Sequence, residues 1–371
     1  MGMNNNIEKV LLEQAKRTRS ALNATFELLP VCNLDCKMCY IRTDMEMVRE
    51  NGGLLPVEKW LNLAKEMRKA GVLFLLLTGG EVFLYPEFRT LYERLIRMGF
   101  VLTINTNATM ISEEMVAWLS QYRPRCVSIS LYGASNQTYK ALCGQKGMFD
   151  RVDWAIRALR QANITVECKM LVNPLNENDM EACVDYCNAL DIPFEMANYT
   201  FPPTRKLKTG EQIRFTPAQA VECGFKINQL MTASENQNEV ILERLVKYRK
   251  GREISGCQQY GFSCTAANSA CWITWQGRMT PCAMLNEPYT LPFKIGFEAA
   301  WNELKLKSDQ VKLCTECSFC DKRSVCNVCP ASCYAETGFI DGQSKYHCEM
   351  TKLQIEKMMK YAEEHYLNWE E

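Results

Sequence analysis

The sequence predicts an α/β protein in which a parallel sheet is followed by a smaller, cysteine-rich module. Three observations predict this arrangement. Short apolar segments alternate with amphipathic segments over residues 24–200. Near residue 200 the chain becomes a polar linker with two prolines, YTFPPTRKLKTGEQ. From Cys257 onward the chain contains 11 of its 20 cysteines.

The alternating region predicts a sheet and the helices that cover it. Short, largely apolar segments are typical of parallel strands buried on both faces, and six are expected strands, at 25–29, 72–77, 101–105, 126–131, 165–171 and 194–197. The segments between them predict helices at 57–70, 87–98, 112–121, 148–162 and 177–189. This alternation indicates a parallel sheet with outer helices, either doubly wound or a partial barrel. Ligand sites in such sheets lie at the carboxyl ends of the strands.

The remaining segments complete the expected domain organisation. A loop-rich, cysteine-dense module cannot build much core, so covalent staples or metal are expected to hold its shape. We predict an N-terminal helical extension over residues 1–23 and the α/β domain over 24–200. A linker follows over 201–255, with helices at about 216–232 and 239–250. The cysteine-rich domain is expected over 256–350 and a C-terminal helix over 351–371.

Composition excludes several classes of partner. Lys plus Arg equals Asp plus Glu, 43 each, so charge gives no reason to expect nucleic acid or an anionic membrane. No apolar run approaches the roughly 20 residues that span a bilayer, and the first residues lack the apolar core of a secretory signal. We therefore expect a cytoplasmic protein. Clustered cysteines in a reducing compartment indicate metal, and with only two histidines, all-thiolate zinc or iron–sulfur sites are favoured.

A cysteine triad, Cys32, Cys36 and Cys39, directly follows the first expected strand in a CxxxCxxC pattern. Three thiolates on one loop can ligate three irons of a [4Fe–4S] cluster and leave the fourth iron open to an exogenous ligand. Three buried free cysteines, or a zinc site with a remote fourth ligand, are the alternatives. The spacing and the place of the triad at the end of a strand favour the cluster.

The triad resembles the cluster loop of the radical S-adenosylmethionine (SAM) superfamily. Met38 stands where that family usually has an aromatic residue, and Tyr40 follows the triad. The resemblance implies a partial (β/α)6 TIM-like barrel. It also implies a cluster that binds SAM and reductively cleaves it to a 5′-deoxyadenosyl radical, which is chemistry that the cofactor supplies.

The resemblance also implies SAM-binding residues after the second strand. Gly79, Gly80 and Glu81 stand where the family binds the amino group of SAM, through glycine carbonyls or the carboxylate. An ordinary strand-to-helix turn is the alternative for this short motif.

Further SAM contacts are implied after the third and fourth strands, where the family binds the ribose or carboxylate with polar residues. Asn107 and Ser130 occupy these places, although small polar residues there could equally be satisfied by neighbouring backbone. Cys143 stands where many relatives carry an arginine for the SAM carboxylate, and Lys140 is the expected substitute.

The C-terminal cysteines resemble the SPASM domain, an extension of some radical SAM enzymes that binds auxiliary [4Fe–4S] clusters. The pattern is a cysteine, a GxxxxC at Gly277 and a CxxCxxxxxC at Cys317. The resemblance implies one cluster on Cys264, Cys282 and Cys329, with Cys271 as an extra ligand, and another on Cys317, Cys320, Cys326 and Cys348. Cys257, Cys314 and Cys333 are left unallocated. Four-thiolate zinc knuckles are the alternative.

Enzymes of this two-part type largely act on peptides and proteins, so the resemblance implies a maturase of a ribosomally synthesised peptide. Auxiliary clusters can accept the electron released when a substrate radical closes a thioether or carbon–carbon crosslink. Three [4Fe–4S] clusters and SAM are the implied cofactors. The implied partners are a precursor peptide and a flavodoxin- or ferredoxin-type electron donor. Only 31 residues precede Cys32, too few for a leader-binding domain. If a leader is recognised, either a separate leader-binding protein or the barrel and the 200–250 segment is expected to bind it.

Two other functions are weighed against this one. Anaerobic sulfatase-maturing enzymes, which form formylglycine, carry an acidic base directly after the GxxxxC cysteine, whereas Ala283 follows Cys282 here. A non-catalytic iron–sulfur or zinc protein is the alternative of a different class. The sequence names no general base.

Overall fold

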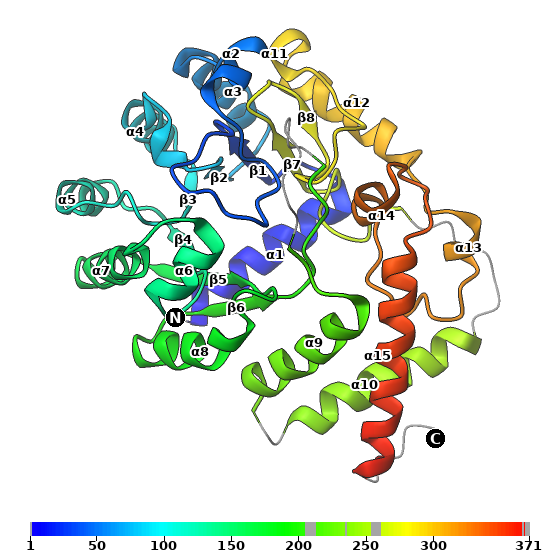
Figure 1. Ribbon diagram of the computed structural model, residues 1–371. Helices are drawn as coiled ribbons and strands as arrows, with labels where there is room; N and C mark the ends of the chain where they lie inside the picture. The colour runs from blue at the N-terminus through cyan, green and yellow to red at the C-terminus, as the bar shows by residue number, and fades with distance from the viewer. Residues whose placement is uncertain (1, 205–212, 234–235, 254–260, 366, 368–371) are drawn as a thin grey trace.

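The computed structural model describes residues 2–204, 213–233, 236–253, 261–365 and 367 (Figure 1). Within them the chain folds around one eight-stranded sheet, in the order β6-β5-β4-β3-β2-β1-β7-β8. Neighbouring strands are parallel except for the antiparallel pair β7–β8. The strands are β1 (Asn23–Glu27), β2 (Phe74–Thr78), β3 (Val101–Thr106), β4 (Cys126–Ser130), β5 (Val166–Leu171), β6 (Phe194–Ala197), β7 (Ala270–Ile273) and β8 (Met279–Thr280).

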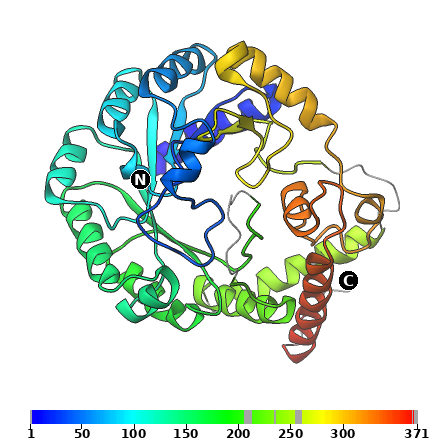
Figure 2. The ribbon, with the colours of Figure 1, turned by 45° about the horizontal axis from the view of Figure 1, so that its top comes forward.

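Helices form an outer layer around this sheet, which confirms the predicted fold class (Figure 2). The five helices predicted within the α/β region correspond to α3, α4, α5, α7 and α8. The helices are α1 (Gly2–Thr18), α2 (Met45–Glu50), α3 (Val57–Lys69), α4 (Phe88–Arg97), α5 (Glu113–Gln121), α6 (Asn136–Cys143), α7 (Met148–Gln161), α8 (Met180–Ala189), α9 (Pro217–Met231), α10 (Gln237–Glu253), α11 (Pro292–Ile295), α12 (Phe297–Asp309), α13 (Thr315–Ser318), α14 (Pro330–Thr337) and α15 (Lys345–Glu364), with short 3-10 turns η1 (Val82–Leu84) and η2 (Glu177–Asp179).

The strand register separates an apolar outer face from a more polar inner face. Residues paired across neighbouring strands share a face. One outer row runs through residues that are almost fully buried under the helices: Phe26, Leu77, Ile104, Val127 and Val166. On the other face, Asn105 pairs with Ser128, which pairs with Glu167. The helices therefore cover the apolar face, and polar side chains line the interior of the partial barrel.

Strands β7 and β8 extend the sheet beyond the six strands that the sequence predicts. β7 lies beside β1 in parallel register, with Cys271 opposite Ala24 and Ile273 opposite Phe26. Both positions are on the outer, apolar face, and Cys271 is buried within the main hydrophobic core. Part of the segment assigned from sequence to the cysteine-rich domain thus belongs to the sheet.

The last part of the chain packs on its own helices. α15 packs against α9 and α10, and Ile241, Leu245, Ile355 and Met358 form the centre of a second apolar cluster there. In Figure 2 these helices and α12 and α14 continue the ring begun by the barrel helices. The cysteine-rich loops therefore lie on the opposite side of the ring from α4 and α5.

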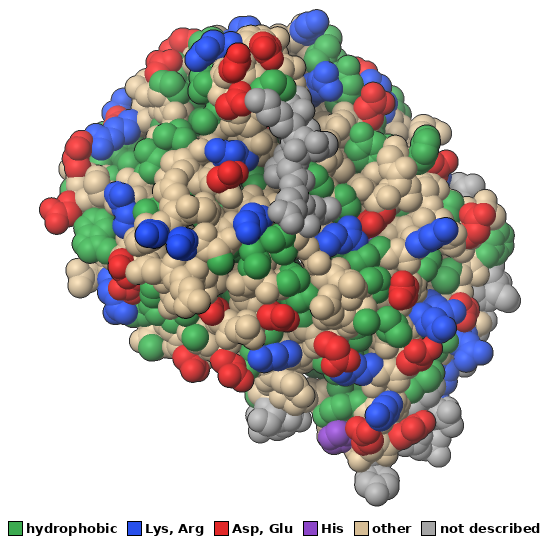
Figure 3. Space-filling model, viewed as in Figure 1, with side chains coloured by type: hydrophobic (Ala, Val, Ile, Leu, Met, Phe, Trp, Pro, Cys, Tyr) green, Lys and Arg blue, Asp and Glu red, His purple; other side chains and the backbone are tan. Residues whose placement is uncertain are grey.

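The surface matches the balanced composition. Basic and acidic side chains are interspersed over the face shown in Figure 3. Within the described residues, none of the helices has the length and apolar character needed to cross a bilayer.

Candidate functional site

The loop that carries Cys32, Cys36 and Cys39 leaves the carboxyl end of β1 and lies across the end of β2. Gly80 N donates to Leu29 O at 2.8 Å, and Glu81 N donates to Val31 O at 2.9 Å. A Cβ on Gly79 would lie 2.6 Å from Leu29 O, and one on Gly80 would lie 2.4 Å from Val31 O. The two glycines are therefore required because the cysteine loop approaches their backbone so closely.

The three thiols and most of the predicted SAM-binding residues line one cavity of about 250 Å³ at the carboxyl ends of the strands. Gly79, Gly80, Asn107 and Ser130 are among the lining residues. Met38 and Tyr40 beside the triad, and Thr78 and Asn105 at strand ends, also line it. Sequence reasoning did not single out the rest of the wall, formed by Leu34, Ile41, Thr106, Tyr132 and Leu171. Their positions at strand ends, or beside the triad, are the signal that could have identified them.

Hydrogen-bond donors point at the sulfurs of the triad. Leu34 N and Asn107 Nδ2 donate to Cys32 Sγ at 3.4 and 3.5 Å, and Arg42 N donates to Cys39 Sγ at 3.2 Å. Burial raises the pKa of the Cys32 thiol to about 12. A buried thiolate at this position therefore needs a compensating positive charge, and a bound metal supplies one.

Asn107 joins the cysteine loop to the end of β3. Its side-chain amide also donates to Asn33 Oδ1 at 3.0 Å, while its own Oδ1 accepts from the Thr109 hydroxyl at 2.6 Å. The Asn107 amide nitrogen thus holds the cysteine loop, and its amide oxygen is occupied by Thr109. Its expected role as a SAM contact becomes secondary to this one.

Glu81 does not reach the cavity, contrary to the expectation that its carboxylate accepts from an ammonium group. The side chain is fully buried and accepts from Asn107 N, the Thr106 hydroxyl and Phe83 N at 2.9, 2.7 and 3.3 Å. Burial raises the pKa of this carboxyl, and the three hydrogen bonds oppose that shift. Glu81 therefore braces the end of β2 against β3, and the carbonyls of Gly79 and Gly80 are what remains for a ligand.

Lys140 is also displaced from its expected place. It is exposed on α6, and it is not among the residues that line the cavity. Helical geometry accounts for this, because Tyr139, Leu142 and Cys143 occupy the buried side of α6. In the described part of the chain, the wall of this cavity contains neither Lys nor Arg.

Cys143, the residue in place of the family's arginine, lies against the triad. The Cys36 and Cys143 sulfurs are 3.5 Å apart, with Cys36 donating. The Tyr132 hydroxyl also hydrogen-bonds to Cys36. Contact with Cys143 and burial raise the pKa of the Cys36 thiol well above its usual value. Cys36 therefore has two polar side-chain neighbours that sequence spacing did not reveal.

Residues 26–187 match the family model described as "Radical SAM superfamily". The chain contains a radical SAM domain. The match begins within β1 and ends in α8, so it covers the partial barrel that carries the triad. This finding sets aside the non-catalytic alternative.

The sequences of curated relatives match different shares of the chain. The AdoMet-dependent heme synthase of Methanosarcina barkeri is 24% identical, over 84% of this chain and 92% of its own length. Two Bacillus subtilis proteins, the antilisterial bacteriocin subtilosin biosynthesis protein AlbA and the sporulation killing factor maturation protein SkfB, are each 30% identical, but the match spans 33% and 39% of their lengths. The similarity to AlbA and SkfB covers 41% and 45% of this chain.

Solved structures share the fold over nearly the whole chain. Streptococcus suis SuiB has a TM-score of 0.66 at 18% identity and covers 93% of this chain and 81% of its own. The structure of anSMEcpe with bound AdoMet has a TM-score of 0.66 at 16% identity, covering 92% of this chain and 99% of its own. At these identities the likeness is one of fold, and it includes the region beyond the barrel.

Four of the predicted auxiliary-cluster cysteines of the radical SAM enzyme surround a second cavity. Cys317, Cys320, Cys326 and Cys348 all line a space of about 190 Å³, together with His347. Cys348 enters from α15, whereas the other three come from α13 and the loop after it. In the described ranges, no group of three or more His, Cys, Asp or Glu side chains has the spacing to hold a single metal ion.

The other predicted ligand set lies on three separate segments. Cys264 precedes β7, Cys282 follows β8, and Cys329 caps the start of α14, where its sulfur accepts from the Ser332 backbone. Ala266 N donates to Cys264 Sγ and Met284 N donates to Cys282 Sγ, both at 3.5 Å. Cys32 and Leu34 N share this contact between a sulfur and the N–H two residues later.

The remaining cysteines near these sites take different positions. Cys271 lies in β7 on the helix-covered face, where burial raises the pKa of its thiol to about 12. Its extra-ligand role is therefore at odds with its place in the core. Cys314 hydrogen-bonds with Cys317, and Cys333 is buried in α14 beside it. Cys257 lies outside the described residues.

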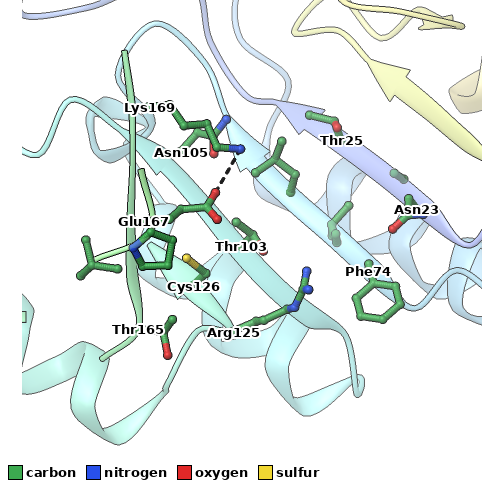
Figure 4. A pocket seen from close by; sticks show the side chains of 15 residues that line it. Asn23, Thr25, Phe74, Thr103, Asn105, Arg125, Cys126, Thr165, Glu167 and Lys169 are labelled. Carbon is green, nitrogen blue, oxygen red and sulfur yellow. Dashed lines mark ion pairs between the residues drawn. The ribbon is translucent and has the colours of Figure 1, made fainter. Parts of the chain in front are cut away.

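Another cavity, of about 630 Å³, is lined by none of the triad cysteines (Figure 4). It lies toward the amino ends of the strands, and Arg125, Glu167 and Lys169 line it. Lys169 contacts Glu167 at 3.1 Å and Glu195 at 3.6 Å, so its charge is compensated within the sheet. Asn105 lines both this cavity and the one around the triad.

Proposed function

We propose that this radical SAM enzyme oxidatively modifies a ribosomally synthesised precursor peptide and forms a thioether or carbon–carbon crosslink. The observation that carries the proposal is the presence of two separate thiol-lined cavities, one at the barrel mouth and one in the cysteine-rich region. The first fits the start of a radical reaction. The second fits an acceptor for the electron that a crosslinking reaction must release.

The triad fits a [4Fe–4S] cluster because its three sulfurs share a cavity wall, and those of Cys32 and Cys39 accept hydrogen bonds from backbone and amide N–H groups. Such donors stabilise thiolate ligands and are a usual part of iron–sulfur sites. Cys32, Cys36 and Cys39 would hold the cluster, and a bound cluster would supply the electron that cleaves SAM. The chain contributes the dry wall of Leu34, Met38 and Ile41, which limits access of water to that chemistry.

SAM would lie in the remaining part of the same cavity. The carbonyls of Gly79 and Gly80 can accept from its ammonium group, and the Ser130 hydroxyl at the end of β4 can bind its ribose or carboxylate. Asn107 contributes mainly by holding Cys32 and Asn33. Glu81 and Lys140 are left out of the proposed SAM site.

Two auxiliary [4Fe–4S] clusters would occupy the cysteine-rich region. Four thiols around a cavity of about 190 Å³ give Cys317, Cys320, Cys326 and Cys348 the space for a polynuclear group. For the second cluster, Cys264, Cys282 and Cys329 each accept a backbone N–H at sulfur. We omit Cys271 from this set because its side chain belongs to the core between the sheet and the helices.

A peptide substrate agrees with what several relatives are named for. AlbA and SkfB are named for bacteriocin biosynthesis and for maturation of sporulation killing factor. Structures with this fold include SuiB bound to the precursor peptide SuiA and anSMEcpe bound to the Kp18Cys peptide. We extend the proposal to a separate leader-binding protein and to a flavodoxin- or ferredoxin-type electron donor.

An anaerobic assay with the precursor peptide encoded beside the gene tests this function. We expect 5′-deoxyadenosine together with a peptide lighter by the mass of two hydrogens. The matched control is Cys36→Ala, which should give neither product. An unchanged peptide mass with 5′-deoxyadenosine formation would contradict the crosslink and point to epimerisation.

A porphyrin substrate is the second candidate, favoured by the extent of the match to the heme synthase. That relative aligns with 84% of this chain and 92% of its own length, and the Fe-coproporphyrin III synthase of the same organism is 28% identical over 44% of this chain. Incubation with iron coproporphyrin in place of peptide separates the two candidates. A new porphyrin species formed with 5′-deoxyadenosine, without peptide turnover, would replace the peptide proposal.

A further inference from the structure

Cys143 lies against the cysteine triad at a position where resemblance led us to expect an arginine. Its sulfur is 3.5 Å from Cys36 Sγ, although the two residues are 107 positions apart in the chain. Cys143 is fully buried, so its thiol faces protein and not solvent. The Tyr132 hydroxyl is the second polar group on the same sulfur.

Both neighbours are held in place by backbone contacts. Asp35 N donates to Cys143 O at 3.2 Å, and Lys37 N donates to Leu142 O at 3.1 Å, so the end of α6 is fastened to the cysteine loop on both sides of Cys36. Tyr132 N donates to the Tyr139 hydroxyl at 3.2 Å, and the two rings lie 5.6 Å apart. Because Tyr139 also belongs to α6, this helix positions both groups.

The direction of the hydrogen bond follows from the chemistry of ligation. A sulfur that ligates iron carries no proton, so Cys36 in the loaded protein can only accept. Cys143 and Tyr132 then become the donors. Cys32 and Cys39 instead receive amide N–H groups from Leu34, Asn107 and Arg42. The three ligands are therefore unequal: one of them is contacted by two side-chain X–H groups.

We propose that Cys143 and Tyr132 are positioning residues that donate hydrogen bonds to the Cys36 thiolate and raise the reduction potential of the cluster. The inference rests on the proposed cluster at the triad. Hydrogen bonds to cluster sulfurs withdraw negative charge and favour the reduced state. A cluster with a higher reduction potential is reduced more readily, but the transfer of its electron to SAM releases less free energy. These two donors thus set how readily SAM is cleaved.

The test is a redox titration of the anaerobically reconstituted full chain, followed by electron paramagnetic resonance. The triad cluster is identified as the signal that changes when SAM is added. Cys143→Ala and Tyr132→Phe should each lower its midpoint potential. A loss of about tenfold in the ratio of reduced to oxidised cluster at fixed potential corresponds to about 59 mV for a one-electron couple. The variant with both changes should show a larger shift than either alone.

Two controls separate this role from a structural one. Cys143→Ser keeps a donor and should retain a potential close to that of the unmodified protein. Cys183→Ala removes another fully buried cysteine, in α8, and should leave the potential unchanged. Iron content is measured for every variant.

Three results would overturn the inference. One is an unchanged potential in Tyr132→Phe and in Cys143→Ala at full iron content. Another is equal loss of potential in Cys143→Ser and Cys143→Ala. The third is loss of iron from the SAM-sensitive cluster in both Cys143 variants, which would make Cys143 a ligand. In each of these cases a SAM-sensitive signal in the unmodified protein would leave the proposed function standing. Absence of that signal from the unmodified protein would remove both the function and the inference.

Discussion

Tyr199 donates a 2.7 Å hydrogen bond to Glu336 Oε1 and thereby joins the end of the barrel to α14. Arg214 approaches the same oxygen at 2.9 Å, with side-chain exposures of only 20% for Arg214 and 13% for Glu336. The Tyr199 ring also lies 4.5 Å from the ring of His347, which lines the second thiol cavity. This contact fixes the cysteine-rich region relative to the barrel.

Replacing Tyr199 with Phe should lower the free energy of unfolding. The hydroxyl donates to a partly buried carboxylate, and such hydrogen bonds contribute about 1.5–3 kcal/mol. Urea denaturation of the anaerobic protein measures the change. Tyr361→Phe is the matched control, because its hydroxyl reaches Asn238 in an exposed contact. Equal effects of the two variants would contradict the assigned role of Tyr199.

Gly79→Ala and Gly80→Ala should release iron from the triad site. Each added methyl group would meet the cysteine loop backbone, at 2.6 Å from Leu29 O or 2.4 Å from Val31 O. The loop must move, so the SAM-sensitive cluster should be lost while iron in the cysteine-rich region remains. Gly224→Ala in α9 is the control, where the added methyl group meets the Asn198 amide at 3.2 Å. Full iron in all three variants would show that the close approach is not required.

Glu81→Gln should lower the free energy of unfolding and leave the SAM affinity of the folded protein unchanged. The carboxylate accepts three hydrogen bonds, and an amide turns one acceptor into a donor that faces another donor, which costs about 1–3 kcal/mol. Denaturation midpoints and SAM binding by the folded fraction separate the two effects. A large loss of SAM affinity at unchanged stability would restore the direct SAM-binding role.

The pH dependence of stability provides a separate test of Glu81. Burial raises its pKa in the folded state. The unfolded chain therefore releases this proton first as the pH rises, so the contribution is fully present below the ordinary carboxyl pKa. It is lost as the pH increases through the raised folded-state value. The slope of unfolding free energy above about pH 4.5 should be flatter in Glu81→Gln, and identical slopes would argue against the burial of a titrating carboxyl.

Cys348→Ala should remove about four irons per chain, the content of one [4Fe–4S] cluster. Cys271→Ala should keep all of them, because Cys271 lies in the core beside Ala24 and not in the second cavity. Iron and sulfide analysis of both variants measures the difference. Iron loss in Cys271→Ala at unchanged stability would return it to the ligand set.

Ser130→Ala should weaken SAM binding by about tenfold, the effect of one lost hydrogen bond of roughly 1.4 kcal/mol. Lys140→Ala should leave it unchanged, because the Lys140 side chain is exposed on α6 and does not line the cavity. Equilibrium dialysis with labelled SAM measures both affinities. The reverse order of effects would place the SAM carboxylate near α6.

Local patterns predicted much of the fold. The strands and the five covering helices of the barrel follow from apolar alternation and amphipathic periodicity, which depend on neighbours within a few residues. β7 was not predicted from these patterns, because its four residues, Ala270–Ile273, form a strand only by pairing with β1. A short segment of this kind has no periodicity long enough to distinguish a strand from a turn.

The residues of the candidate site were likewise predicted only in part. Cys32, Cys36 and Cys39 belong to one loop, so their spacing alone brings them to one place. Glu81 and Lys140 were assigned from their positions along the chain, but the direction of each side chain depends on which surface the rest of the fold covers. Packing of β2 against β3 turned Glu81 inward, and packing of α6 left Lys140 outside.

By itself, the sequence determined the cysteine triad, the order of strands and helices, and the supply of thiols after residue 256. The resemblance of the cysteine pattern also grouped Cys348 with Cys317, Cys320 and Cys326, which line one cavity. The tertiary structure alone decided that Cys143 lies against Cys36. The reason is physical: spacing constrains atoms a few bonds apart, whereas contacts between distant segments arise only when burial of apolar surface brings those segments together.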